Sequence, residues 1–196
     1  MAETSFYFDL GSPYAWLSAE RIDGAFEAAG LPAPEWKPVL LGGLFKRFDR
    51  GSWALTDERA KGMAEIERRA AEYGLPPLEW PDPWPGMYLV SMRAATAAAA
   101  EGRTKEFALA CFRRSFTEGL DPANRGTLEL AASDVGLDTD ELFISASSVD
   151  IKSSLKATTE MAGNRGVIGV PTVAIGDRNF FGDDQLDDAI EFAVSQ

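Results

Sequence analysis

The chain has 196 residues, which is enough for one large domain or two small ones with a buried core. Its 31 acidic and 19 basic residues give a net charge of −12, so nucleic acids and anionic membranes are not expected as partners. Hydrophobic residues make up 45% of the chain, yet no apolar run approaches the roughly 18 residues of a membrane span, and no signal peptide is expected.

The sequence contains no histidine and a single cysteine, Cys111. Without histidine the chain cannot build a Ser-His-Asp triad or a histidine-ligated metal centre, and no metal site is expected. One cysteine allows neither an internal disulfide nor a Cys-x-x-Cys redox pair. Both facts suit a cytoplasmic protein, in which Cys111 is expected to be a small buried hydrophobic residue.

Residues 5–17 contain the first predicted strand and the start of the first helix. Phe6 and Phe8 alternate with other side chains, as in a short strand, and a glycine ends it. Ser12 followed by Pro13 is typical of a helix N-cap with proline at the first helical position. Two roles of the Ser12 hydroxyl fit this stretch equally well: it only caps the helix, or it also binds an anion at the helix start.

A helix is predicted over residues 13–29 from apolar positions spaced three and four apart, and Gly30 ends it. Residues 35–40 are typical of a strand. Pro38 within this strand cannot donate a hydrogen bond to a neighbour, so the strand is expected at a sheet edge. A β-α-β unit of this length implies that the two strands are parallel.

The middle of the chain is predicted to be helical. Thr56 is expected to cap the first of these helices and Gly74 to end it. Apolar periodicity and glycine breaks predict further helices over residues 87–101, 104–118, 127–135 and 140–146, and one marked by Ile151, Leu155 and Met161.

Five prolines and two tryptophans lie between Pro76 and Pro85, which predicts a rigid loop rather than a flexible linker. Two roles are compatible with Trp80 and Trp84. They pin the loop to the core, which is the commoner role of such side chains, or they line a pocket for a flat aromatic ligand.

Residues 169–175 and 179–181 are predicted to form a hairpin with a tight turn at Gly176. A terminal helix follows from Asp183 and Asp184, whose carboxylates favour a helix N-terminus. The order of elements is thus β-α-β, a helical block, then β-β-α. This order predicts an α/β fold in which one small sheet, built from both ends of the chain, carries an inserted all-α domain.

Three segments carry a resemblance to a known family: residues 6–14 (FYFDLGSPY), 42–46 (GGLFK) and 166–172 (GVIGVPT). They resemble 2-hydroxychromene-2-carboxylate isomerases, within the DsbA-like thioredoxin superfamily that includes the kappa-class glutathione transferases. The resemblance implies a thioredoxin-like domain formed by residues 1–41 and 165–196, with residues 42–164 as the inserted helical domain. It also implies a homodimer.

The resemblance implies chemistry that uses glutathione as a cosubstrate. Ser12 stands where thiol-disulfide relatives place their first cysteine, and it is expected to be catalytic by holding the glutathione thiolate. The pKa of a free thiol is about 8.5, and a helix N-terminus lowers it. In this superfamily the proline of Val-Pro-Thr is cis and lies beside the active site. The resemblance therefore places Pro171 there, with the backbone of Val170 free to pair with the glutathione peptide.

Three charged residues complete the glutathione site that the resemblance implies. Asp183 and Asp184 match an acidic pair that receives the γ-glutamyl ammonium group. Lys46 matches a lysine that meets a carboxylate of glutathione or of the substrate.

Departures from the family's pattern indicate a changed substrate site. Arg50 stands where the family usually has asparagine, and Met87-Tyr88 stand where it usually has Asn-Thr. Arg50 either binds a carboxylate through a charge-assisted hydrogen bond or is a solvated surface residue. Arg50 and Trp84 are the candidate substrate-binding residues.

The expected function is that of a glutathione-dependent isomerase acting on an unsaturated acid from aromatic degradation. Two alternatives stay open: a kappa-class-like glutathione transferase that forms a stable conjugate, and a glutathione- or ligand-binding protein without turnover. The expected partners are glutathione and a small aromatic-derived acid.

Overall fold

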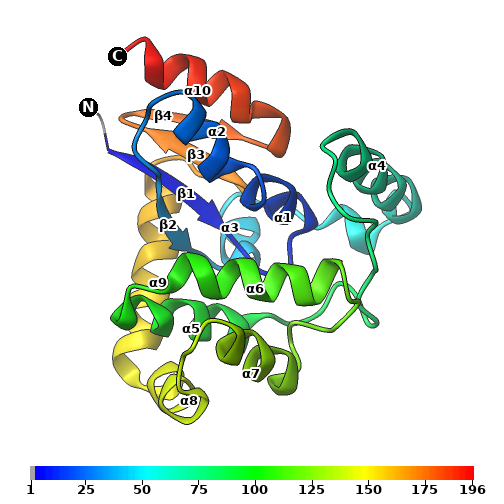
Figure 1. Ribbon diagram of the computed structural model, residues 1–196, viewed down its shortest axis with the longest axis vertical. Helices are drawn as coiled ribbons and strands as arrows, with labels where there is room; N and C mark the ends of the chain where they lie inside the picture. The colour runs from blue at the N-terminus through cyan, green and yellow to red at the C-terminus, as the bar shows by residue number, and fades with distance from the viewer. Residues whose placement is uncertain (1–2) are drawn as a thin grey trace.

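The computed structural model describes residues 3–196 and contains a four-stranded sheet (Figure 1). Its strands, in the spatial order β2-β1-β3-β4, are β1 (Thr4–Phe8), β2 (Glu35–Pro38), β3 (Thr172–Ile175) and β4 (Arg178–Phe181). β2 is parallel to β1, whereas β3 is antiparallel to both of its neighbours. The predicted parallel pair, the edge position of the strand with Pro38 and the C-terminal hairpin are therefore confirmed.

The connection between β1 and β2 consists of two helices, α1 (Pro13–Ala19) and α2 (Ile22–Ala28). The prediction of one helix over residues 13–29 is therefore wrong. At the junction the N–H of Arg21 donates to a carbonyl oxygen three residues earlier, and this 3₁₀-type bond tightens the chain. Ile22 beyond the break is still fully buried, so the apolar spacing identified the right face but not the break.

Between β2 and β3 the chain is helical, as predicted (Figure 1). The helices are α3 (Leu41–Arg47), α4 (Arg59–Glu72), α5 (Leu89–Ala97), α6 (Thr104–Phe116), α7 (Arg125–Asp134), α8 (Thr139–Ser147) and α9 (Val149–Asn164). The 3₁₀ turns η1 (Trp53–Leu55) and η2 (Ala98–Glu101) precede α4 and follow α5, and the chain ends with η3 (Asp183–Gln185) and α10 (Leu186–Val194). The α/β order with a helical insertion is thus observed, while the exact domain boundaries stay a prediction.

Two predicted helices differ in detail from the observed ones. α4 begins at Arg59 rather than directly after Thr56, because Thr56 ends the preceding 3₁₀ turn with an extended backbone. The Thr56 hydroxyl nevertheless accepts a hydrogen bond from the N–H of Glu58. Met161, predicted on the inner face of α9, is 59% exposed, because its neighbour Ala162 faces the core instead.

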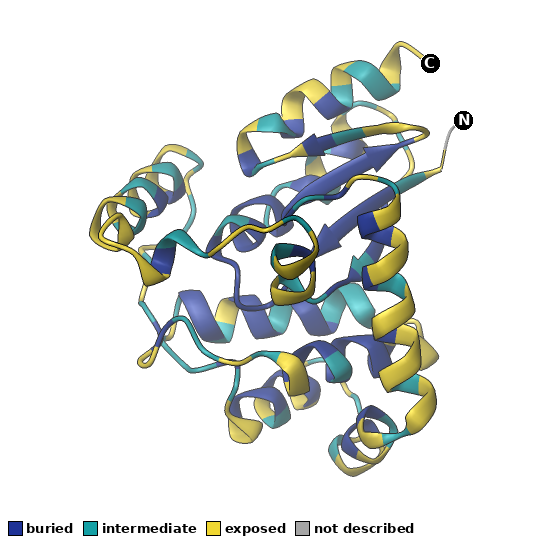
Figure 2. Cartoon of the chain, turned by 180° about the vertical axis from the view of Figure 1, so that it is seen from behind, coloured by how far each residue is buried: buried dark blue, intermediate teal, exposed yellow. Residues whose placement is uncertain are grey.

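The two central strands, β1 and β3, are buried on both faces (Figure 2). Phe6 and Phe8 of β1 belong to the large core that contains side chains of α1, α2, α6 and α10. Tyr7 points to the other face, where it packs in a smaller cluster with Leu44 of α3 and Ala162 of α9. The loop at the C-terminal end of β1 is therefore anchored to a strand that is packed on both faces.

α4 stands to one side of the sheet (Figures 1 and 2). An ion pair connects it to the C-terminal segment. Arg69 Nη1 of α4 lies 2.8 Å from Oδ1 of Asp183, and the Tyr73 hydroxyl donates to the other carboxylate oxygen at 3.0 Å. Asp183 is only 1% exposed. The Arg21 guanidinium lies 3.6 Å from the centroid of the Tyr73 ring and closes this cluster. Asp183 therefore fastens α4 to the rest of the molecule.

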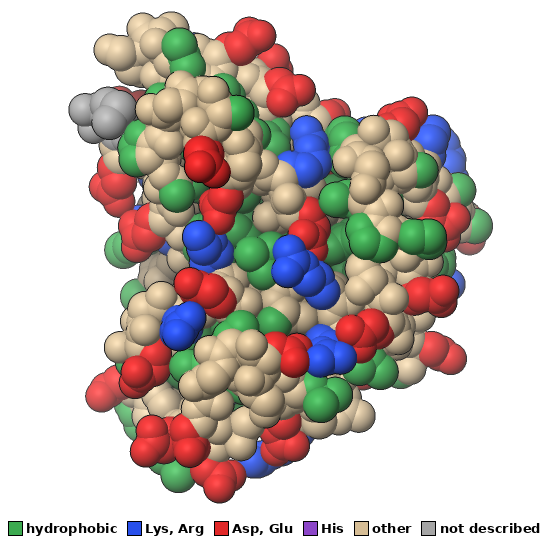
Figure 3. Space-filling view, in the orientation of Figure 1, with side chains coloured by type: hydrophobic (Ala, Val, Ile, Leu, Met, Phe, Trp, Pro, Cys, Tyr) green, Lys and Arg blue, Asp and Glu red, His purple; other side chains and the backbone are tan. Residues whose placement is uncertain are grey.

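Acidic side chains occur along most of the outline of the molecule, with basic ones among them (Figure 3). Within residues 3–196, no helix is both long and apolar enough to cross a bilayer. In the same part of the chain, no three His, Cys, Asp or Glu side chains gather as they would around a metal ion.

Candidate active site

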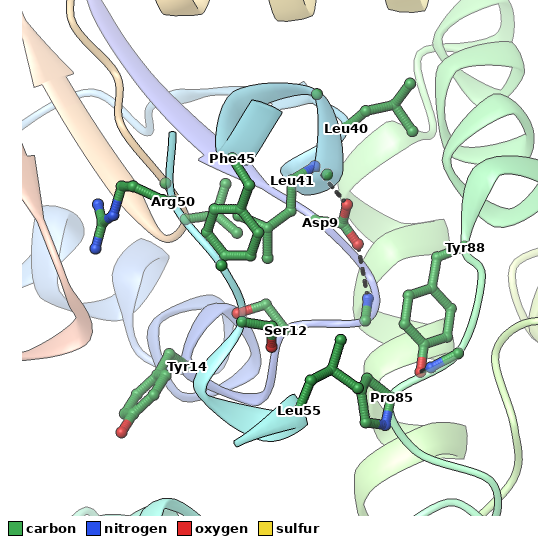
Figure 4. A pocket seen from close by; sticks show the side chains of 18 of the residues that line it. Asp9, Ser12, Tyr14, Leu40, Leu41, Phe45, Arg50, Leu55, Pro85 and Tyr88 are labelled. Atoms are coloured by element: carbon green, nitrogen blue, oxygen red, sulfur yellow. Dashed lines mark hydrogen bonds between the residues drawn. The ribbon is translucent and has the colours of Figure 1, made fainter. Parts of the chain in front are cut away.

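A cavity of about 740 Å³ opens where the end of β1 turns into α1 (Figure 4). Its walls come from the loop before α1, from α3 and η1, from the loop before α5, and from the residues that precede β3. Aromatic and aliphatic side chains such as Phe45, Leu55 and Trp84 form much of the lining. A mostly apolar cavity of this size with a few polar groups is typical of a small-molecule site.

Ser12 lies in the cavity wall and caps α1, as predicted. Its Oγ accepts a hydrogen bond from the N–H of Ala15 at 3.2 Å. The Ser12 hydroxyl proton and the N–H of Tyr14 have no acceptor within residues 3–196, and both residues line the cavity. Because α1 has 7 residues, its dipole is weaker than that of the longer helix predicted here. These two donors are therefore the main groups that an anion would meet at the start of α1.

Val170 offers an unpaired stretch of backbone to the cavity. The Val170–Pro171 peptide bond is cis, as predicted. Neither the N–H nor the C=O of Val170, which lines the cavity, makes a hydrogen bond in the described part of the chain. β3 begins only at Thr172, beyond the proline that has no N–H to donate. A peptide lying along Val170 could pair with its backbone as a neighbouring strand would.

Asp9 is a cavity residue that the sequence did not reveal. It is 5% exposed, and its carboxylate oxygens accept the N–H groups of Gly11 and Leu41, both at 2.9 Å (Figure 4). These bonds join the loop that carries Ser12 to the start of α3. Burial raises the pKa of Asp9 from 3.8 to about 6, although the two backbone hydrogen bonds oppose this rise. An acid two residues before a glycine signals a local turn, but the sequence gives no sign of the second partner, 32 residues away.

Trp84 has both of the roles that were considered for the indoles of its loop. It is 6% exposed, and its Nε1 donates to the carbonyl oxygen of Gly11 at 3.1 Å, which fixes the loop that carries Ser12. Its ring lies 4.7 Å from that of Trp80 and 5.5 Å from that of Trp53, measured between centroids. Trp84 and Trp53 also line the cavity, whereas Trp80 only packs behind them.

Arg50 lies at the exposed rim of the cavity (Figure 4). Its Nη1 donates to the carbonyl oxygen of Ile168 at 3.3 Å, and its guanidinium lies 5.3 Å from the centroid of the Phe181 ring. The other guanidinium N–H groups of Arg50 have no acceptor within residues 3–196. Arg50 is thus both a surface arginine and a cation placed to meet a ligand carboxylate.

Four residues predicted to bind glutathione do not line the cavity: Lys46, Pro171, Asp183 and Asp184. Lys46 is exposed in the last turn of α3, and the Asp184 side chain is 58% exposed. The carboxylate of Asp183 is buried and already paired with Arg69 and Tyr73. The predicted site residues that the structure brings together around the cavity are Ser12, Arg50, Trp84 and Val170.

A family model of the DsbA-like thioredoxin domain matches residues 4–191. The chain belongs to this family. Among curated proteins, a 2-hydroxychromene-2-carboxylate isomerase from Sphingobium xenophagum is 28% identical over 189 residues, which cover 93% of each chain. Among solved structures, a 2-hydroxychromene-2-carboxylate isomerase has a TM-score of 0.86 at 23% identity, covering 98% of this chain and 94% of that one. A probable DsbA oxidoreductase from Streptomyces coelicolor has a TM-score of 0.81 at 17% identity, covering 100% of this chain and 89% of that one.

The predicted resemblance and the thioredoxin-like fold with a helical insertion are thereby confirmed. This DsbA-like protein has Ser12-Pro13-Tyr14-Ala15 at the start of α1, and hence no thiol there. Its one cysteine, Cys111, is fully buried in α6, as predicted, and burial raises the pKa of its thiol. Any thiol that acts in the cavity must therefore arrive with a ligand.

Proposed function

We propose that this protein is a glutathione-dependent isomerase that acts on an unsaturated acid derived from an aromatic compound. The observation that carries the proposal is the pair of unpaired donors at Ser12 and Tyr14, in one cavity with the unpaired backbone of Val170. The similarity to a 2-hydroxychromene-2-carboxylate isomerase over 93% of both chains supports the isomerase class.

Glutathione bound here would supply a thiolate to the cavity. The Ser12 hydroxyl and the Tyr14 N–H would donate to the charged sulfur and stabilise it relative to the thiol. A hydrogen bond to a charged group contributes about 1.5–3 kcal/mol, and about 1.4 kcal/mol corresponds to one pKa unit. One such bond would bring the thiol pKa from about 8.5 into the neutral range, where the thiolate is well populated.

The residues around the cavity suit part of a tripeptide. The N–H and C=O of Val170 would pair with its backbone, and this contact needs no rearrangement because both groups are unpaired. The ends of the tripeptide would extend past the rim, where Lys46 and Asp184 are exposed for a carboxylate and an ammonium group. Asp183 fits less well, since an incoming ammonium would have to displace Arg69.

The apolar walls suit a flat substrate with an aromatic part, packed against Trp84, and the free N–H groups of Arg50 would hold its carboxylate. In the proposed reaction a conjugated C=C bond of the substrate accepts the thiol sulfur, and its electron pair moves to the substrate's carbonyl oxygen. The former double bond, now single, rotates. The electron pair then returns, the double bond re-forms and the C–S bond breaks, so glutathione is not consumed.

The test combines a calorimetric glutathione titration with a spectrophotometric assay of a hydroxychromene carboxylate. We expect binding, and turnover that requires glutathione without consuming it. S-methylglutathione is the matched control: it offers the same peptide without a free thiol, so it should bind and support no turnover. A stable glutathione conjugate in the mass spectrum would instead identify a transferase, and binding without turnover a binding protein. Failure to bind glutathione would contradict the proposal.

A further inference from the structure

Tyr88 is a cavity residue with no role in the reaction as described above. It directly precedes α5 and lines the cavity on the side away from Arg50 (Figure 4). Its ring packs against the backbone of Gly11: a Cβ atom added at Gly11 would lie 2.0 Å from two carbons of the ring. The ring therefore keeps its place only because residue 11 is glycine, next to Ser12.

The Tyr88 hydroxyl is held by a hydrogen bond in which it is the acceptor. The N–H of Gly86 donates to it at 2.6 Å. The proton of the hydroxyl has no acceptor among residues 3–196, so its capacity to donate is unused. Burial raises the pKa of Tyr88 above its usual range, and the phenol therefore keeps its proton at neutral pH.

We infer that the Tyr88 hydroxyl donates a hydrogen bond to the carbonyl oxygen of the substrate while negative charge develops there. This inference rests on the proposed function. The electron pair reaches that oxygen when the C–S bond forms and leaves it when the C–S bond breaks, so the charge is transient and no proton has to be transferred. A donor that is already fixed stabilises the charged state without reorganising, and this effect is large in a cavity from which water is excluded.

Two contacts make Tyr88 suited to this role. The hydrogen bond from Gly86 polarises the hydroxyl and strengthens it as a donor. The packing of the ring on Gly11 connects the oxygen-binding donor to the loop that carries Ser12, the group proposed to hold the sulfur. The two groups therefore lie on adjoining parts of the cavity wall. The proposed substrate requires this, because its reacting carbon and its carbonyl oxygen belong to the same small π-system.

Tyr88→Phe tests the inference, because it removes the hydroxyl and keeps the ring that packs on Gly11. In the glutathione-dependent assay we expect kcat to fall by about 10²- to 10³-fold, as for the loss of one donor to a developing oxyanion. The KM values for substrate and for glutathione should change little, because the bond strengthens only as charge develops. Tyr7→Phe is the matched control: Tyr7 is 4% exposed, its side chain makes no hydrogen bond within residues 3–196, and it does not line the cavity, so kcat should be unchanged.

A second measurement does not depend on turnover. Nitrophenol, whose ionised form absorbs visible light, carries its charge on an oxygen attached to a flat ring. Its pKa on the wild-type protein should be lower than in water, and this lowering should be lost in Tyr88→Phe and kept in Tyr7→Phe. If the wild-type protein shows no glutathione-dependent turnover, the proposed function fails while this titration still decides the role of Tyr88. Equal nitrophenol titrations on the wild type and on Tyr88→Phe would overturn the inference, as would a Tyr88→Phe enzyme with the kcat of the wild type.

Discussion

The indole Nε1 of Trp84 donates a hydrogen bond to the carbonyl oxygen of Gly11 at 3.1 Å, although 73 residues separate the two. This bond joins the proline-rich loop of the helical insertion to the turn that carries Ser12. Both partners have little contact with solvent, since Gly11 is buried and Trp84 is 6% exposed.

Trp84→Phe should therefore destabilise the protein, because the Gly11 carbonyl loses its donor in a buried position. The expected cost is about 1–3 kcal/mol of unfolding free energy, measured by urea denaturation. Trp80→Phe is the matched control, because the Nε1 of Trp80 donates to Glu67 at the surface, where water can replace it. Equal losses in the two variants would show that the bond to Gly11 contributes nothing measurable.

Ser12→Ala and Ser12→Gly separate capping from anion binding. Because Ser12 caps α1, Ser12→Ala should lower the free energy of unfolding by about 0.5–2 kcal/mol. Ser12→Gly should lower it by only a few tenths of a kcal/mol. If Ser12 also holds the glutathione thiolate, both variants should lose roughly ten- to two-hundred-fold in turnover, despite their different stabilities. The pKa of the bound thiol, followed by thiolate absorbance, should rise toward its free value in both. Full turnover with an unchanged thiol pKa in Ser12→Gly would leave Ser12 as a helix cap alone.

Asp9 predicts a pH dependence of stability. Its pKa rises from 3.8 to about 6 on folding, so the folded state binds its proton more tightly than the unfolded chain does. The stability that this carboxyl contributes is fully present below pH 3.8 and is lost as the pH rises through about 6. One pKa unit corresponds to about 1.4 kcal/mol, so the loss is of the order of 3 kcal/mol.

Asp9→Asn removes this pH-dependent contribution to stability. The variant is expected to be less stable than the wild type, because its amide cannot accept from both Gly11 and Leu41. The difference in unfolding free energy between the two proteins should shrink as the pH rises from 4 to 7, measured by urea denaturation at each pH. A difference that is constant across this range would mean that Asp9 titrates normally in the folded protein.

Asp183 was expected to bind the ammonium group of glutathione, and the structure gives it Arg69 as a partner. Removing either member of a buried ion pair leaves the charge of the other without a partner. Arg69→Gln and Asp183→Asn should therefore each lower the free energy of unfolding, measured by urea denaturation, by about 3 kcal/mol. The double variant should lose less unfolding free energy than the two single variants together, and the difference, the coupling energy, should be about 1–3 kcal/mol.

Glutathione affinity distinguishes the two roles of Asp183. If the residue only fastens α4, Asp183→Asn should bind glutathione as the wild type does in calorimetry at a temperature where both are folded. Asp184→Asn is the matched comparison, because its carboxylate is 58% exposed and only loosely paired with Arg69, at 3.7 Å. A large loss of affinity in Asp183→Asn, with Asp184→Asn unaffected, would restore the role that the sequence suggested for Asp183.

The sequence by itself determined the elements that local chemistry encodes. The alternation in β1, the Ser12-Pro13 cap and the hairpin around Gly176 each depend on residues within a few positions of one another, and all three are present. The resemblance to a known family added the cis bond at Pro171 and the thioredoxin-like arrangement of the sheet.

Only the tertiary structure decided how the cavity is closed and which charges are free in it. The bonds from Leu41 to Asp9, from Trp84 to Gly11 and from Arg69 to Asp183 span 32, 73 and 114 residues. They depend on how the helical insertion packs against the sheet, and the periodicity of a single helix carries no information about which partner a side chain meets on another element. For this reason the sequence could identify Ser12 as a candidate, but it could not show that Tyr88 packs against the neighbouring Gly11 or that Asp183 is already paired.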